Sequence, residues 1–104
     1  MSETPVTMVK FSEIAVSDLV NYLRITEPTS SDNVLLTNIL EAAKNYVLMY
    51  TGQTETAADT YPEFVIVVYV LAQDMYDNRS YSAVSPNVNK IVDSILGLHS
   101  INLL

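Results

Sequence analysis

The segment "FVIVVYVLA", residues 64–72, decides the fold. Its valines and isoleucine are β-branched residues, which β-strands favour. A strand needs a partner strand, however, and no other segment of the chain offers a convincing one. Just before the run, Thr60-Tyr61-Pro62-Glu63 has the pattern of a capping box with proline in the first helical turn. Because apolar residues also continue at helical spacing beyond the run, we predict a helix that extends to about Asn78.

The predicted helix ends in a polar stretch, Tyr76-Asp77-Asn78-Arg79. Asn78 suits a helix end because asparagine tolerates left-handed backbone geometry. A cation at Arg79 is favoured beside the exposed carbonyls of a last helical turn. We therefore interpret Asn78 and Arg79 as a structural helix stop. Asp74 and Asp77 lie three residues apart and, with Glu63, could form an acid/base pair, but a solvated helix end is the interpretation that we favour.

The flanking segments also show helical spacing. A long stripe between Leu35 and Tyr50 predicts about five turns, with Ser31 or Asp32 as the cap and Gly52 as the terminator. A shorter helix begins at Ser17 or Asp18 and reaches about Arg24, and a last helix begins at Ser85-Pro86 and closes at Gly97. Residues 26–33 and 53–60 are predicted to be loops.

The expected architecture is all-α, a small antiparallel bundle of about four helices. One domain spans residues 1–104. We divide it into an extended N-terminal arm (1–16), the helical bundle (17–97) and a C-terminal tail (98–104).

The composition indicates self-association. Apolar residues make up 49% of the 104 residues and charged residues only 16%. A helix that is apolar on every side must be covered on every side, and so few helices cannot cover residues 64–72 completely. We therefore expect part of the apolar surface to lie against another copy of the chain. The predicted subunit contacts are Phe64, Val67, Val70, Tyr46 and Tyr50, with Val67 and Val70 facing outward. The two tyrosines could equally lie in the core.

The same composition argues against several other classes of protein. The net charge is −7, and five basic residues form no cluster for nucleic acid or an anionic membrane. Cysteine is absent, and the longest apolar run is far shorter than the roughly 20 residues that span a bilayer. The N-terminus lacks the features of a signal peptide, so a cytoplasmic location is the default expectation.

No set of residues indicates catalysis. His99 has no partner at metal-ligand spacing, and the two glycines form no phosphate-binding loop. The nucleophile motif G-x-S-x-G is also missing. We therefore expect no catalytic, cofactor or metal site.

Four stretches, in this order, resemble the head–tail connector family of tailed bacteriophages, also called adaptor or head-completion proteins. The stretches are Tyr22-Leu23-Arg24-Ile25, "EAAKNYVLMYTG" (41–52), "DMYDNRS" (74–80) and Ser85-Pro86-x-Val88. The likeness covers residues 17–97. The loop after Ile25 is less acidic than is usual in the family, and Ser80 stands where glutamate is common.

The resemblance implies an all-helical virion protein of the phage neck. Such proteins form a homo-oligomeric ring, usually of about twelve copies, beneath the portal protein. The ring extends the channel for genomic DNA, which passes without sequence-specific binding, and it supports the stopper or tail-completion protein. Assembly takes place in the host cytoplasm. The alternative function is a non-viral cytoplasmic helical adaptor that binds a protein partner without forming a ring.

The C-terminal tail is unusually apolar for a solvated segment. Leu98, Ile101, Leu103 and Leu104 are large aliphatic residues within seven positions. One possibility is that the tail folds back on its own bundle. The resemblance implies another, in which these residues dock on the portal or on a neighbouring subunit.

Overall fold

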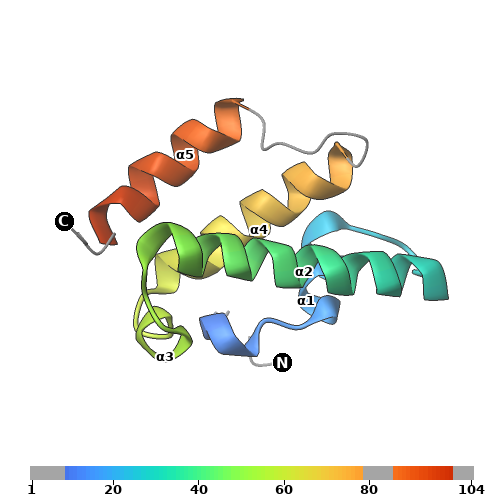
Figure 1. Ribbon diagram of the computed structural model, residues 1–104. Helices are drawn as coiled ribbons and strands as arrows, with labels where there is room; N and C mark the ends of the chain where they lie inside the picture. The colour runs from blue at the N-terminus through green and yellow to red at the C-terminus, as the bar shows by residue number, and fades with distance from the viewer. Residues whose placement is uncertain (1–8, 79–85, 100–104) are drawn as a thin grey trace, which may run out of the picture.

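A computed structural model describes residues 9–78 and 86–99 (Figure 1). The helical elements, in chain order, are η1 (Phe11–Glu13), α1 (Val16–Leu23), α2 (Ser30–Thr51), α3 (Glu55–Ala58), α4 (Pro62–Asp77), α5 (Pro86–Leu96) and η2 (Gly97–His99). Within these two ranges there is no strand, which confirms the predicted all-α class. The described chain has five α-helices rather than about four.

The longest helix, α2, lies at the centre of the bundle. Its N-cap is Thr29, whose hydroxyl accepts a hydrogen bond from the backbone N–H of Asp32, 3.1 Å away. The Asp32 carboxylate in turn accepts from the Thr29 N–H at 2.9 Å. The predicted caps, Ser31 and Asp32, were therefore wrong, because Asp32 acts from the third helical position. At the other end Gly52 is left-handed (φ 71°), as predicted.

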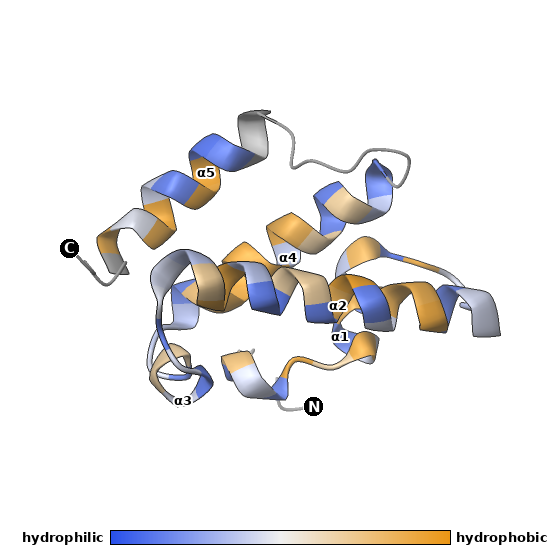
Figure 2. Cartoon of the chain, viewed as in Figure 1, coloured by the Kyte–Doolittle hydropathy of each residue, from blue (hydrophilic) through white to orange (hydrophobic). Residues whose placement is uncertain are grey.

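Helix α4 confirms the interpretation of the apolar run. It is antiparallel to α2 and packs along it (Figures 1 and 2). The helix begins at Pro62 with Tyr61 as the N-cap. The predicted cap, Thr60, instead donates its hydroxyl to the carbonyl of Ala57 at 2.7 Å. The buried side chains of α4 are Phe64, Val65, Val67, Val68, Leu71, Ala72 and Asp74.

The C-terminal end of α4 is a helix stop that uses a side chain. Asn78 is the C-cap, and its Nδ2 donates to the carbonyl and to Oδ1 of Asp74, both at 3.1 Å. Its φ of −118° is not left-handed, so the reason given for choosing asparagine was wrong. The side-chain amide caps the helix instead. Arg79, the other half of the predicted stop, lies outside the described residues.

The N-terminal segment is part of the core rather than only an extended arm. Phe11, in η1, and Ile14 are buried. Helix α1 begins at Val16, because the carboxylate of Asp18 accepts from the N–H of Ala15 at 2.8 Å. The prediction that Ser17 or Asp18 would be the N-cap was therefore wrong. Helix α1 itself was predicted, whereas η1, with three residues, is too short for a periodic pattern to reveal it.

A short helix occupies the region predicted to be a polar loop. Thr54 caps α3 by accepting from the N–H of Ala57 at 3.1 Å. Just after α3, Asp59 accepts two hydrogen bonds from Ser12, one from its N–H and one from its hydroxyl, each 2.8 Å long. These bonds lower the pKa of Asp59 and tie η1 to α3.

The last helix, α5, packs on α4 and α2 (Figure 1). Pro86 is its first residue, as predicted, while Ser85 lies outside the described residues. Val92 and Leu96 are the buried side chains of α5 in the described region. Helix α5 ends at Leu96, immediately before Gly97, as predicted, and Gly97 begins η2.

Candidate subunit-contact surfaces

The outward face of α4 exposes apolar side chains. Ile66 is 47% exposed, and Val70 one turn later is half-buried. The same face continues to Gln73 and Asp77, both exposed, at steps of three and four residues. The polar end of the stripe is solvated, whereas its first half presents aliphatic groups to solvent.

Helix α1 enlarges this apolar surface. Tyr22, which is 41% exposed, stacks on Tyr69 of α4, with ring centroids 4.8 Å apart and planes inclined by 21°. Burial, and then the nearby charge of Asp18, raise the pKa of Tyr69. We name Tyr22, Ile66, Tyr69 and Val70 the α4 patch. Exposed apolar patches of this kind are typical of sites where another protein binds.

Two of the residues predicted to contact a neighbouring subunit lie inside the bundle instead. Phe64 and Val67 are fully buried. Phe64 packs edge-on against Phe11, with ring centroids 6.4 Å apart. The outward orientation predicted for Val67 was therefore wrong, while Val70 lies in the α4 patch. The polar residues at the end of α4 give the signal for this exposed face. Helical spacing places Ile66 on the same face as Gln73 and Asp77.

Tyr46 and Tyr50 lie in a polar seam between α2 and α5. Their rings stack with centroids 6.2 Å apart. The hydroxyl of Tyr46 donates to Oδ1 of Asn89 at 3.4 Å, and that of Tyr50 to Oδ1 of Asp93 at 2.6 Å. The hydrogen bond to Asp93, followed by burial, raises the pKa of Tyr50. Both tyrosines thus hold α5 on its own chain, and their predicted role between subunits stays a prediction.

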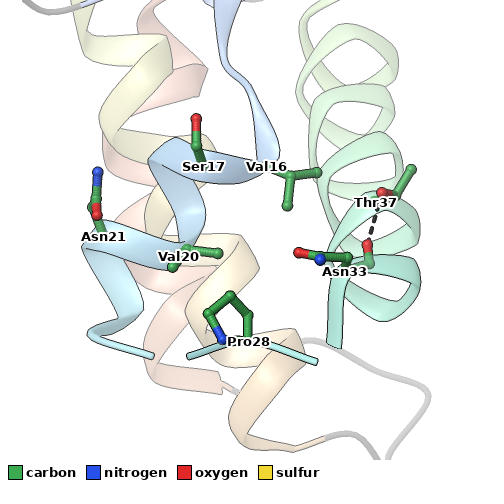
Figure 3. Close-up of a pocket in the computed structure, with 7 residues that line it drawn as sticks. All are labelled: Val16, Ser17, Val20, Asn21, Pro28, Asn33 and Thr37. Atoms are coloured by element: carbon green, nitrogen blue, oxygen red, sulfur yellow. Dashed lines mark hydrogen bonds between the residues drawn. The ribbon is translucent and has the colours of Figure 1, made fainter. Parts of the chain in front are cut away.

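A second surface feature is an open cleft of about 400 Å³ between α1 and α2 (Figure 3). We name it the α1–α2 cleft; it is lined by Val16, Ser17, Val20, Asn21, Pro28, Asn33 and Thr37. The side chains of Val16, Val20, Pro28 and Asn33 converge between the two helices (Figure 3). The Thr37 hydroxyl donates to the backbone carbonyl of Asn33 at 2.8 Å. The cleft therefore combines apolar walls with polar side chains, among them the amides of Asn21 and Asn33.

Beside the cleft, α2 exposes a further aliphatic group. Val34 is 65% exposed and lines a neighbouring depression of about 440 Å³ together with Ser30, Ser31, Leu35 and Asn38. The first turns of α2 thus present apolar surface on two sides. No sequence prediction identified this region, because Val34 precedes the predicted stripe of α2, which begins at Leu35.

The predicted docking residues are described only in part. Leu98 in η2 is 84% exposed, so it is not folded back on the described bundle. Ile101, Leu103 and Leu104 lie outside the described residues, as does Arg79. Whether the tail binds a partner stays a prediction at this point.

Acidic residues in the described ranges do not converge on a metal site. Among residues 9–78 and 86–99, no group of three or more histidine or carboxylate side chains is placed to hold a metal ion. Asp74 is 8% exposed and accepts from the Asn78 amide, whereas Asp77 is exposed. In the same ranges, no helix combines the length and apolar character of a membrane span.

In the described residues the chain is a small all-helical protein with exposed apolar surface outside its core. Comparison with protein families makes this specific: the model of the phage gp6-like head-tail connector protein family matches residues 13–100. The chain belongs to this family, as its sequence motifs predicted. Searches of curated proteins and of solved structures gave no match. Family membership assigns the chain a structural role where the phage head and tail join.

Proposed function

We propose that the chain is a ring-forming adaptor of the phage neck, located between the portal vertex and the stopper or tail. The observation that carries the proposal is the family match over residues 13–100. Copies assemble side by side beneath the portal in the host cytoplasm and remain in the virion. This role is structural and needs neither a catalytic step nor a cofactor.

The α4 patch supplies the contact between neighbouring copies. About half of Ile66 is still exposed in the single chain. Full burial of such a side chain contributes about 1.5–3 kcal/mol, so covering the remaining half contributes on the order of 1 kcal/mol. The stacked pair Tyr22 and Tyr69 adds a large rigid surface beside it. A ring repeats this contact between every pair of neighbours.

The charge of the chain fits a channel through which DNA must slide. The net charge is −7. A wall rich in Lys and Arg would bind phosphates and release their counterions, which would hold the DNA in place. An acidic wall repels the phosphates instead, so DNA passes without being held.

The proposal is tested by comparing two glutamate variants. Ile66→Glu places a carboxylate in the α4 patch, where burial at a contact is costly. Asn45→Glu is the matched control, because Asn45 is exposed on α2 and lies outside the patch. Native mass spectrometry and attachment to portal-bearing capsids measure assembly, and circular dichroism measures helix content.

We expect wild type and Asn45→Glu to form rings, alone or on the portal, and Ile66→Glu to remain monomeric with unchanged helix content. Normal assembly of Ile66→Glu would show that the contact lies elsewhere. A wild-type chain that forms no ring in either setting would contradict the proposed function.

A further inference from the structure

The α4 patch is too small to form a stable contact by itself. Its four side chains are each less than half exposed, with Ile66 at 47% and Tyr22 at 41%. A large aromatic side chain has about 150–250 Å² to bury, so four such partly exposed side chains offer at most about 500 Å². A specific protein contact buries about 800 Å² on each partner. The surface that links two copies must therefore include more than the patch.

The symmetry of a ring also restricts what the patch can bind. If the patches of two copies bound each other, the contact would be isologous and assembly would stop at two copies. A ring needs a heterologous contact, in which the patch of one copy binds a different surface of the next copy. The inference therefore rests on the proposed function, and it requires a second surface on the same chain that is complementary to the patch.

The α1–α2 cleft lies on the opposite side of α1 from the patch. Val20 lines the cleft on the α2 side of α1 (Figure 3), and Tyr22 of the patch follows it by two residues. Each residue of an α-helix turns the chain by about 100°, so these two side chains leave α1 about 200° apart. In a ring of about twelve copies each copy is rotated by only about 30° relative to its neighbour, so its two contact surfaces must lie on nearly opposite sides. The cleft and the patch are arranged in this way around α1.

The cleft and the patch are also complementary in chemistry. Val16, Val20 and Pro28 give the cleft apolar walls, and the side chain of Asn33 projects between α1 and α2 (Figure 3). The phenols of the two stacked tyrosines in the patch make no hydrogen bond to any group within residues 9–78 and 86–99. A tyrosine hydroxyl both donates and accepts a hydrogen bond, and so does an asparagine amide. Aromatic rings with polar tips therefore fit apolar walls that carry an amide.

The surface beside the cleft supplies further apolar area. Val34 follows Asn33 on α2, is 65% exposed and lines the neighbouring depression of about 440 Å³. Two other exposed apolar residues, Met49 at 83% and Ile91 at 45%, line neither the cleft nor this depression. A contact that covers the cleft together with Val34 comes closer to the area that a stable interface buries.

We propose that the α4 patch of one copy inserts into the α1–α2 cleft of the next copy in the ring, with its two tyrosines against the valines and the Asn33 amide of the cleft. Every copy offers a patch on one side and a cleft on the other, so the contact repeats from copy to copy until the ring closes. Each copy then buries both surfaces, and the exposed apolar surface around α1 is covered.

Site-specific photo-cross-linking tests which surface the patch binds. The test variant carries the photoreactive analogue p-benzoylphenylalanine in place of Tyr22, where it retains an aromatic ring at a partly exposed position. The control carries the same analogue in place of Met49, which is exposed on α2 outside both surfaces. Rings are assembled, alone or on portal-bearing capsids, from equal amounts of ¹⁵N-labelled and unlabelled chains. After irradiation, cross-linked peptides are identified by mass spectrometry.

We expect position 22 to form cross-links that join labelled to unlabelled chains and that end on residues 16–21 or 28–37 of the other copy. Position 49 should form none to these residues. Rings in which position 22 cross-links other copies only outside these residues, or cross-links no other copy, overturn the inference and leave the ring function intact. Failure of the wild-type chain to form rings, with or without portal-bearing capsids, overturns both.

A glutamate variant tests the cleft without photochemistry. Asn33→Glu places a carboxylate in the cleft at a position that is exposed in the single chain, so helix content should not change. Burial of this charge at the contact is costly, and association should weaken at least tenfold, as for Ile66→Glu. Asn45→Glu, about three turns further along α2, is the matched control and should assemble normally. Unchanged association of Asn33→Glu, measured by sedimentation and native mass spectrometry, contradicts the proposed contact.

Discussion

The hydrogen bond between Tyr50 and Asp93 gives a quantitative test of how α5 is held on the bundle. The donor and acceptor oxygens are 2.6 Å apart, and the acceptor is a carboxylate. Hydrogen bonds to charged groups contribute about 1.5–3 kcal/mol. Because Asp93 is exposed, solvent screening reduces the value, and we expect Tyr50→Phe to cost about 1 kcal/mol. For a domain of this size the Tm should fall by about 4–8 °C.

A double-mutant cycle separates this bond from other effects of the substitution. Tyr50→Phe, Asp93→Asn and the double variant are compared by thermal unfolding, and we expect a coupling energy of at least about 0.5 kcal/mol. Tyr46→Phe is the matched control, because its bond to the neutral Asn89 is longer, at 3.4 Å. If Tyr50→Phe were no more destabilising than Tyr46→Phe, and the coupling were zero, the carboxylate bond would not hold α5.

The pH dependence of this contribution follows from the raised pKa of Tyr50. The phenol donates the bond only while it is protonated, and folding raises its pKa above the ordinary value of 10.0. The contribution is therefore complete below pH 10.0 and is lost as the pH rises through the higher folded pKa. The Tm difference between wild type and Tyr50→Phe should therefore stay constant up to about pH 10 and shrink at higher pH.

Three further predictions concern the core, the N-terminal segment and a helix cap. Phe64→Ala should lower the unfolding free energy by about 3–5 kcal/mol, whereas Ile66→Ala should cost well under half as much, because Phe64 is buried and Ile66 is not. Equal losses for the two variants in chemical denaturation would contradict the assignment of Phe64 to the core and Ile66 to the surface. Asp59 has a lowered pKa through its bonds to Ser12, so its stabilisation is present above pH 3.8 and is lost as the pH falls further. The Tm gap between wild type and Asp59→Asn should accordingly close at acid pH, and a gap that widens there would refute the role of Ser12. Thr29→Ala removes the N-cap of α2 and should cost about 1 kcal/mol by thermal unfolding, with no loss expected if the helix began elsewhere.

The sequence was sufficient where a pattern extends over many residues. The stripe of α2 and its terminal Gly52 predicted the central helix, and Pro62 outweighed the strand propensity of the valines in α4. The packing of the buried side chains of α4 outweighs the weak helix propensity of its valines, because tertiary context overrides such small preferences.

Features that depend on tertiary packing were not predictable from the pattern. Phe11 is buried because η1 packs near α3 and α4, and an isolated phenylalanine in a mixed segment gives no periodic signal. The outward direction of α4 was misjudged for a related reason. Neighbouring elements cover most faces of α4, so Val67 is buried. The face that carries Ile66 remains exposed. The α1–α2 cleft arises from two segments whose relative placement the sequence does not encode locally.

The most direct test of the central claim is a focused cryo-electron microscopy reconstruction of the neck of the phage that encodes this chain. We predict a closed ring of about twelve copies between the portal and the tail, with the α4 patch at the contact between neighbours. A neck that contains no copy of the chain, or that contains it only as separate monomers, would contradict the account.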